Sequence, residues 1–198
     1  MTLYDLKPRF QNFLRPLATW LAGMGVTANQ LTLTAAVLSV FLGTLLCLAG
    51  GKGLFLLLPM WLFVRMALNA IDGMLAREFG QKSRLGGYLN ELCDVVSDAA
   101  LLLPLAFVAP FTPAAVFAVI FAATLSEYAG VMGPLVGAAR RYDGPLGKSD
   151  RALVLGALGL WIGLGLPLPS WLFWLMPALT ALLAVTIVNR IYRGLLET

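Results

Sequence analysis

Six long apolar segments dominate this chain of 198 residues, and they limit its fold more than any other feature. A helix that crosses a bilayer needs about 20 consecutive, mostly apolar residues. Only 12% of the residues are charged, whereas soluble domains have about 25%, so a soluble globular domain is excluded. We expect an all-α integral membrane protein with six transmembrane helices in residues 29–198. The segments lie at about 30–49, 54–76, 86–109, 112–138, 151–167 and 170–193.

Residues 1–28 have a different pattern from the six segments. Apolar residues recur there at helical spacing from Leu3 to Leu17, and three basic residues lie between them. This pattern is typical of an amphipathic helix that lies in the membrane interface. We therefore expect an N-terminal interfacial amphipathic helix, followed by Thr27 as the N-cap of the first membrane segment.

Most basic residues lie in the connections that fall on one side of a six-span protein. By the positive-inside rule, we expect these connections and both termini on the cytoplasmic side of the inner (plasma) membrane. The net charge of +4 thus indicates membrane orientation, and we expect no nucleic-acid partner. Twelve of the 14 Lys and Arg residues belong to this set: Lys7, Arg9, Arg15, Arg77, Lys82, Arg84, Arg140, Arg141, Lys148, Arg151, Arg190 and Arg193.

Five acidic residues lie in or at the edges of the apolar segments, where charge is costly. Each ionised group costs about 2.5–3.5 kcal/mol at the centre of a span. Such acids are candidates for a functional site, or else they reach the interface or pair with Arg65. For Arg65 the expected partners are Asp72 or Glu127, unless it lines a cavity. The five acids are Asp72, Glu91, Asp94, Asp98 and Glu127.

The acids gather on one face of each of two neighbouring segments. Asn90, Asp94 and Asp98 are spaced by four residues, so they differ by only about 40° per step around a helix. Asn69 and Asp72 share a face of the preceding segment. A short loop joins the two segments, so we expect them to be antiparallel neighbours whose oxygens face each other. Such oxygens suit Mg²⁺ or Mn²⁺, and a cation beside basic loops suits phosphoryl transfer.

The same stretch resembles the signature of the CDP-alcohol phosphotransferase (CDP-alcohol phosphatidyltransferase) family. That signature reads D-x-x-D-G-x-x-A-R, eight residues, then G-x-x-x-D-x-x-x-D. The spacing matches throughout, and the chain departs only at Asn69 and Asn90, which stand where the family has aspartate. The six matching positions are Asp72, Gly73, Ala76, Arg77, Gly86 and Asp94. The six-span layout with an N-terminal interfacial helix is also what this resemblance implies.

The resemblance implies an enzyme that moves a phosphatidyl group from CDP-diacylglycerol to a polar alcohol and releases CMP. It implies that Asp72 is a metal ligand, with Asn69 and Asn90 as neutral co-ligands, and that Asp94 is the general base. Asp98 lies one turn beyond Asp94, so we expect it to serve as a further ligand or an alternative base. The altered site is then a working variant that uses Asp98, a weak metal site or a silent one.

Further roles follow from the resemblance. Asp72, Gly73, Ala76, Arg77 and Gly86 are expected to bind the CDP moiety, with Arg77 on donor phosphate. A second basic cluster is expected to bind the acceptor, which is often a phosphorylated alcohol in this family, or else it serves orientation alone. That cluster comprises Arg140, Arg141 and Lys148.

The motif is also compatible with other functions. The same motif serves transfer from a soluble CDP-alcohol to a lipid alcohol, and a silent homologue would bind CDP-lipid without turnover. The expected cofactor is Mg²⁺ or Mn²⁺, and the expected partners are CDP-diacylglycerol, a polar alcohol, the lipid bilayer and a second copy of the chain in a homodimer.

Overall fold

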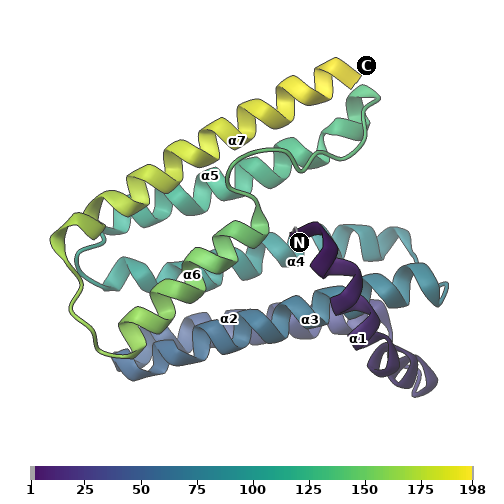
Figure 1. The fold of residues 1–198 in the computed structure, drawn as a ribbon, viewed down its shortest axis with the longest axis horizontal. Coiled ribbons are helices and arrows are strands. Elements are labelled where there is room, and N and C mark those ends of the chain that lie inside the picture. Colours follow the sequence, from purple (N-terminus) through teal and green to yellow (C-terminus); the bar gives the residue numbers. More distant parts are fainter. Residues whose placement is uncertain (1–2, 198) are drawn as a thin grey trace.

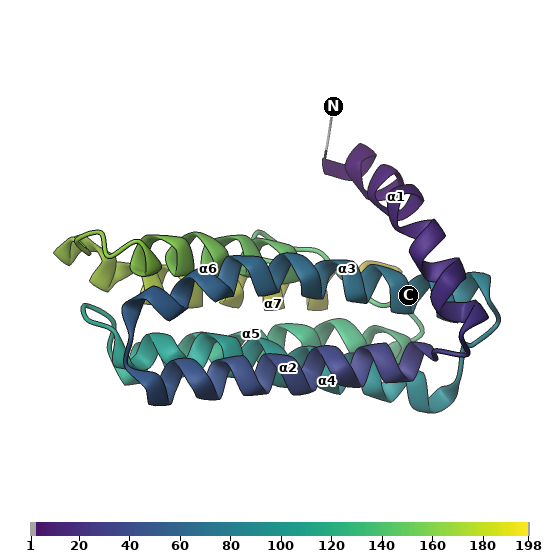
Figure 2. The same cartoon turned by 90° about the horizontal axis from the view of Figure 1, so that it is seen from below.

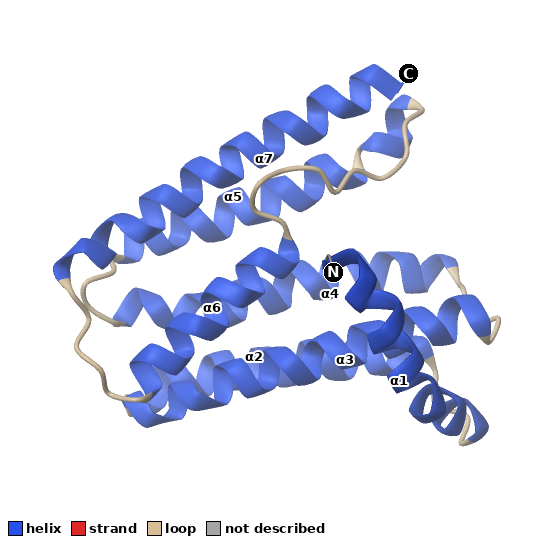
Figure 3. Ribbon diagram, in the orientation of Figure 1, coloured by secondary structure: helices blue, strands red, loops and turns tan. Residues whose placement is uncertain are grey.

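The computed structural model describes residues 3–197, of which residues 3–9 are described by their backbone alone, and every element in it is helical (Figures 1 and 3). Each of the six expected segments forms a helix, but the bounds differ by several residues at some ends. The long helices are α1 Leu3–Gly23, α2 Ala28–Ala49, α3 Leu57–Glu78, α4 Arg84–Leu102, α5 Pro113–Val131, α6 Lys148–Gly163 and α7 Leu175–Glu197. Four short 3₁₀ helices accompany them: η1 Lys52–Leu56, η2 Leu103–Phe107, η3 Gly133–Val136 and η4 Ser170–Trp174.

Hydroxyl side chains determine where several helices begin. The Thr27 hydroxyl accepts from the backbone N–H of Gln30, whose side chain accepts from the N–H of Thr27 in return, so the predicted N-cap is confirmed. The hydroxyls of Ser83 and Thr112 cap α4 and α5 by accepting from the backbone N–H groups of Gly86 and Ala115. These bonds satisfy N–H groups that have no partner inside a helix.

Four helices within the described residues are long and apolar enough to cross a membrane. They are α2, α3 extended by η1, α5, and α7 extended by η4. The other two differ for physical reasons: α4 carries several charged residues along its length, and α6 has only 16 residues. At about 1.5 Å per residue, 16 residues fall short of a hydrocarbon core about 30 Å thick. The count of six spans therefore stays a prediction.

The helices α3 and α4 are held by a common partner. Helix α2 packs closely against both of them, whereas the backbones of α3 and α4 are not extensively packed on each other. The two helices face each other, as expected, but they do so through side chains and not through close backbone packing. Gly43 allows the close approach of α2 to α4, because a Cβ at this position would overlap the carbonyl group of Ala100. The remaining space between α3 and α4 is bridged by polar side chains, which form the site described below.

The second half of the bundle is built on α5 and α7, which run side by side (Figure 1). Helix α6 packs against α3 and η1 and so joins the two halves. The large apolar core lies between these elements and includes Leu58, Leu101, Met176 and Leu183, all fully buried. This core positions the polar residues of α3, α4, α5 and α6 around one region.

Helix α1 leaves the bundle at an angle (Figure 2). Leu14 and Ala18 are buried in a small core with α2 and α3, while Phe13 and Trp20 are exposed. The predicted apolar and basic positions before Phe10 lie outside the described side chains. Figure 1 shows α1, the α3–α4 loop and the C-terminal end of α7 at one end of the bundle, as the basic pattern predicts. The side of the membrane on which that end lies stays a prediction.

Candidate active site

The polar faces of α3 and α4 meet through Asn69 and Asp94. The Asn69 amide Nδ2 donates to Asp94 Oδ1 at 3.2 Å. One turn along α3, Asp72 is buried and its Oδ2 accepts from the hydroxyl of Thr32 on α2 at 2.8 Å. Asn90 is half-buried one turn before Asp94 on α4. The structure thus brings four of the predicted ligands to one region, and it adds Thr32, which no sequence signal indicated.

Arg65 links α3 to α4 by two ion pairs. Its Nη1 lies 2.6 Å from Asp98 Oδ1, and its Nη2 lies 3.3 Å from Asp94 Oδ1. The guanidinium is almost fully buried, and it also donates to the backbone carbonyl of Asp94. Two of the five acids thus pair with Arg65, as the alternative interpretation predicted, but the specific partners expected for it, Asp72 and Glu127, are wrong. Asp98 is held by arginine on both oxygens, because its Oδ2 accepts from Arg151 Nη2 at 2.9 Å.

Two residues of the predicted acceptor cluster reach the α4 face. Lys148 begins α6, and its Nζ makes an ion pair with Asp94 Oδ2. Arg140 lies 2.7 Å from Glu91 Oε1, and its guanidinium stacks on the ring of Tyr142 at 4.6 Å. The candidate general base and the candidate acceptor-binding lysine are thus in direct contact.

Arg141 lies in a separate group, so the structure does not bring it to the predicted acceptor cluster. Its guanidinium pairs with Asp143 at 2.9 Å and with Glu197 at the end of α7. Burial opposes ionisation of Asp143, but the hydrogen bond and charge of Arg141, with the charge of Arg193, outweigh it, so the pKa of Asp143 lies below its ordinary value. This second group fastens the α5–α6 loop to α7.

The basic residues Arg151 and Arg190 were assigned to membrane orientation, yet both are buried against acids. Arg151 Nη2 donates to Glu127 Oε1 at 3.0 Å as well as to Asp98. Arg190 Nη1 lies 3.5 Å from Glu127 Oε2 and donates to the carbonyl of Ser126. Position in the chain gave no sign of this, because both residues lie at span ends where topology alone explains a base.

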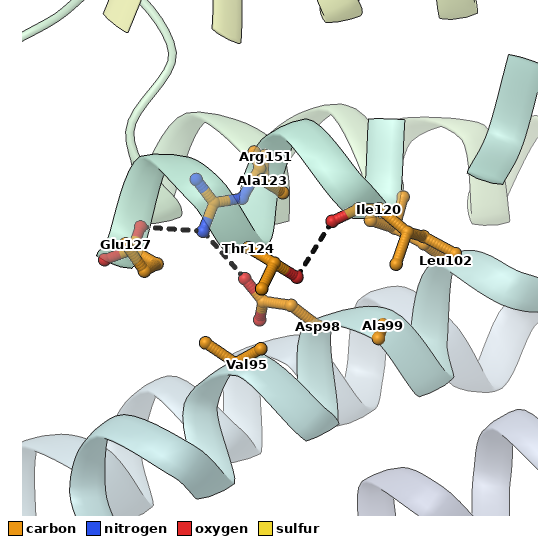
Figure 4. Close-up of a pocket in the computed structure, with 9 residues that line it drawn as sticks. All are labelled: Val95, Asp98, Ala99, Leu102, Ile120, Ala123, Thr124, Glu127 and Arg151. Carbon is orange, nitrogen blue, oxygen red and sulfur yellow. Dashed lines mark hydrogen bonds and ion pairs between the residues drawn. The ribbon is translucent and has the colours of Figure 1, made fainter. Parts of the chain in front are cut away.

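A small cavity of about 10 Å³ lies beside this cluster, between α4 and α5. Figure 4 shows the Arg151 guanidinium between the carboxylates of Asp98 and Glu127, with Thr124 next to them. The other walls are apolar, formed by Val95, Ala99, Leu102, Ile120 and Ala123.

The predicted CDP-binding residues lie at the α3–α4 end of the bundle. Arg77 is exposed, its guanidinium lies over Gly73, and it makes no ion pair with the side chains described in residues 10–197. A Cβ on Gly73 would lie 2.8 Å from Arg77 Nη2. A Cβ on Gly86 would lie 2.8 Å from Asn29 Oδ1 on α2. Ala76 is half-buried against the small core.

The donor atoms of the α3–α4 region have the chemistry of a hard divalent cation site. Asp72 and Asp94 supply carboxylates, and with its Nδ2 donated to Asp94, Asn69 keeps its amide oxygen available. Mg²⁺ and Mn²⁺ prefer oxygen ligands of these kinds. No group of three or more His, Cys, Asp or Glu in the described chain is arranged to hold a metal. A cation here would therefore depend on amide oxygens as well as carboxylates.

Comparison with known sequences identifies relatives over nearly the whole chain. The sequence pattern described as CDP-alcohol phosphatidyltransferase matches residues 25–188. The Inner membrane protein YnbA of Escherichia coli is 48% identical over 193 residues, covering 96% of this chain and 94% of that protein. The Archaetidylinositol phosphate synthase of Pyrococcus horikoshii is 26% identical over 198 residues, covering 97% and 96%.

Solved structures of one protein share the fold. Phosphatidylinositol phosphate synthase (PgsA1) of Mycobacterium tuberculosis with CDP-DAG bound has a TM-score of 0.74 at 24% identity, covering 90% of this chain and 92% of that one. The form in complex with manganese and citrate has a TM-score of 0.73 at 23% identity, covering 90% and 87%. Together, the matched pattern, the relative at 48% identity and the shared helical fold show that this chain is a membrane protein of the CDP-alcohol phosphatidyltransferase family.

Proposed function

We propose that this protein transfers a phosphatidyl group from CDP-diacylglycerol to a polar alcohol and releases CMP. The observation that carries the proposal is the meeting of Asp72, Asn69 and Asp94 between α3 and α4, with Lys148 paired to Asp94. The names of the relatives support it, since one is an Archaetidylinositol phosphate synthase and another was solved with CDP-DAG bound.

The chain's own residues would carry most of the chemistry. Asp94 takes the proton of the acceptor hydroxyl, whose oxygen forms a bond to the phosphorus that carries diacylglycerol. The bond from that phosphorus to the CMP oxygen breaks, and CMP leaves with the electron pair. Arg77, which pairs with no acid among the side chains of residues 10–197, binds donor phosphate.

The carboxylate and amide oxygens of this region are ligand types that a divalent cation such as Mg²⁺ or Mn²⁺ prefers. Asp72, Asp94, Asn69 and Asn90 would hold it, and Thr32 would orient Asp72. When bound, Mg²⁺ or Mn²⁺ supplies charge that stabilises the pyrophosphate and the leaving CMP. The manganese in the PgsA1 structure supports this cofactor class.

Asp98 has a different role in this proposal from the ligand or base predicted from sequence. Both of its oxygens accept from arginines, Arg65 at 2.6 Å and Arg151 at 2.9 Å. A carboxylate held on both oxygens by buried arginines orients the two guanidinium groups and, through Arg65, the neighbouring Asp94. Asp94 differs, because its second oxygen pairs with the more exposed Lys148. We assign it as a positioning residue.

The orientation in the membrane completes the proposal. We assign α2 to α7 as six crossings, and α1 as the interfacial helix. Both termini and the site then face the cytoplasm, which agrees with the positions of the basic residues. The homodimer stays a prediction.

The test is CMP release by the purified protein in detergent with CDP-diacylglycerol, Mn²⁺ or Mg²⁺ and a panel of alcohols. We expect release with at least one acceptor, and a loss of about 100-fold or more in Asp94→Asn. Asp143→Asn is the matched control, because its carboxylate belongs to the Arg141 group, and it should keep wild-type turnover. CDP-diacylglycerol binding without CMP release from any acceptor would indicate a silent homologue, and full turnover in Asp94→Asn would exclude it as the base.

A further inference from the structure

Three arginines at or beside the predicted acceptor cluster share one carboxylate, that of Glu127 on α5. Its Oε1 accepts from Arg151 at 3.0 Å, and its Oε2 lies 3.5 Å from both Arg140 and Arg190. The Glu127 side chain is only 10% exposed, so water does not compensate its charge. Glu127 thus occupies the place between three guanidinium groups that an anionic ligand would need.

From this arrangement we propose that the acceptor is an uncharged polyhydroxyl alcohol and that Glu127 selects it against a phosphate monoester. The inference rests on the proposed function, since it defines the second substrate of that reaction. It differs from the expectation that the basic cluster binds a phosphorylated alcohol.

The connected cluster is nearly neutral. Five cations and four carboxylates are joined in it through ion pairs, which leaves a net charge of only +1. A phosphate monoester carries about −1.5 to −2 at neutral pH. Placed here, it would lie against Glu127 and its neighbouring acids, and like charges side by side disfavour a ligand strongly. The members are Arg65, Arg140, Lys148, Arg151, Arg190, Glu91, Asp94, Asp98 and Glu127.

The cluster offers both hydrogen-bond donors and hydrogen-bond acceptors to a ligand. Arg151 Nε and Nη1 and Arg140 Nε are buried and have no hydrogen-bond partner in the described chain. The carboxylates of Glu127 and Asp98 lie next to them and accept hydrogen bonds (Figure 4). A hydroxyl group both donates and accepts, so several hydroxyls could satisfy both sets, whereas the oxygens of a phosphate dianion only accept.

The cavity beside the cluster has the same mixed character at its polar end. Asp98, Glu127 and Arg151 line it together with Thr124, whose hydroxyl donates to the carbonyl of Ile120 and can still accept. Buried donors without partners are costly. The cavity, at about 10 Å³, has room for one hydroxyl-sized group. A ligand hydroxyl there would accept from Arg151 and donate to an acid, and it would remove that cost.

The experiment compares matched acceptors that differ by one phosphate. CMP release from CDP-diacylglycerol with Mn²⁺ is measured for glycerol against glycerol 3-phosphate and for inositol against inositol 1-phosphate. We expect kcat/KM for the free polyol to exceed that for its monophosphate by about tenfold or more in at least one pair. A preference for the monophosphate in both pairs would overturn the proposal while leaving the proposed function in place.

Glu127→Gln tests the assigned residue, since it keeps the size of the side chain and removes its charge. We expect the ratio of kcat/KM for polyol over monophosphate to fall by about tenfold. Glu197→Gln is the matched control, because Glu197 pairs with Arg141 outside the cluster, and its ratio should equal that of the wild type. An unchanged ratio in Glu127→Gln would refute the role of Glu127.

A binding measurement with the wild-type protein needs no turnover. Inorganic phosphate is titrated into the metal-free wild-type protein in EDTA, and heat is recorded by calorimetry. We expect no saturable binding at millimolar phosphate. Saturable binding that disappears in Arg151→Gln would show that the cluster accepts phosphate, and it would overturn the proposal even if no acceptor releases CMP.

Discussion

Replacing Arg65 by methionine tests whether the ion pairs between α3 and α4 hold the site together. Arg65 is 5% exposed and bonds Asp98 at 2.6 Å and Asp94 at 3.3 Å. Methionine keeps most of the apolar stem but leaves two carboxylates with one basic partner fewer. Removing one partner of a buried pair costs about 3–5 kcal/mol. Because Arg151 and Lys148 still hold these acids, we expect the lower end, about 3 kcal/mol.

The assay is reversible unfolding of the purified protein in mixed micelles, with the free energy of unfolding measured for each variant. Arg15→Met is the matched control: its partner Glu78 is also exposed, at 48% and 39% for the two side chains, so its loss should leave stability unchanged. CMP release should also fall in Arg65→Met, since Asp94 loses a group that orients it.

A double-mutant cycle separates the pair from general damage. Asp98→Asn in the Arg65→Met background should recover part of the loss, with a coupling energy of about 1–3 kcal/mol. Two costs that simply add, or an Arg65→Met protein as stable as the wild type, would refute the idea that these ion pairs fasten α3 to α4.

Three further predictions concern other parts of the molecule. Gly43→Ala should lower the free energy of unfolding by about 1–3 kcal/mol, because the new Cβ would overlap the α4 backbone. The control Gly23→Ala should leave this free energy unchanged, since a Cβ there meets nothing within 4 Å. Equal stabilities of the two variants would contradict the close packing of α2 on α4. The pKa of Asp143 is lowered in the folded protein, so its carboxylate contributes stability that is present above the unfolded pKa of about 3.9 and is lost as the pH falls through the folded pKa. Asp143→Asn should therefore flatten the dependence of the melting temperature on pH below about pH 4. An acid profile identical to that of the wild type would exclude this contribution. Thr32→Val removes the hydroxyl that donates to Asp72 and should raise the Mn²⁺ concentration for half-maximal CMP release about tenfold; an unchanged metal requirement would place Asp72 outside the metal site.

Much of the fold and part of the site could be predicted from local pattern. Long apolar runs indicate helices without knowledge of their neighbours, and the capping box at Thr27 is a local sequence feature. Residues four apart share a helix face, so Asn90 and Asp94 could be assigned to one surface. The structure places Asn69 of α3 against Asp94, as the facing polar surfaces predicted.

The partners of the charged groups were less predictable. Periodicity tells which face of a helix a residue occupies, but not which element lies opposite. Arg65 was expected beside Asp72 or Glu127 and instead binds Asp94 and Asp98. Arg141, adjacent in sequence to Arg140, reaches a different group because the loop directs the two side chains apart.

The sequence by itself determined the helical membrane class, the family and the ligand-rich faces, because each depends on composition or on spacing within about 30 residues. Only the tertiary structure decided that α2 packs against both α3 and α4, and that Arg151 and Arg190 converge on Glu127. The two ion pairs with Glu127 join it to Arg151, 24 positions away, and to Arg190, 63 positions away in the chain. Their formation depends on the packing of whole helices, and long flexible side chains such as arginine can reach several acids, so no local pattern specifies which one is bound.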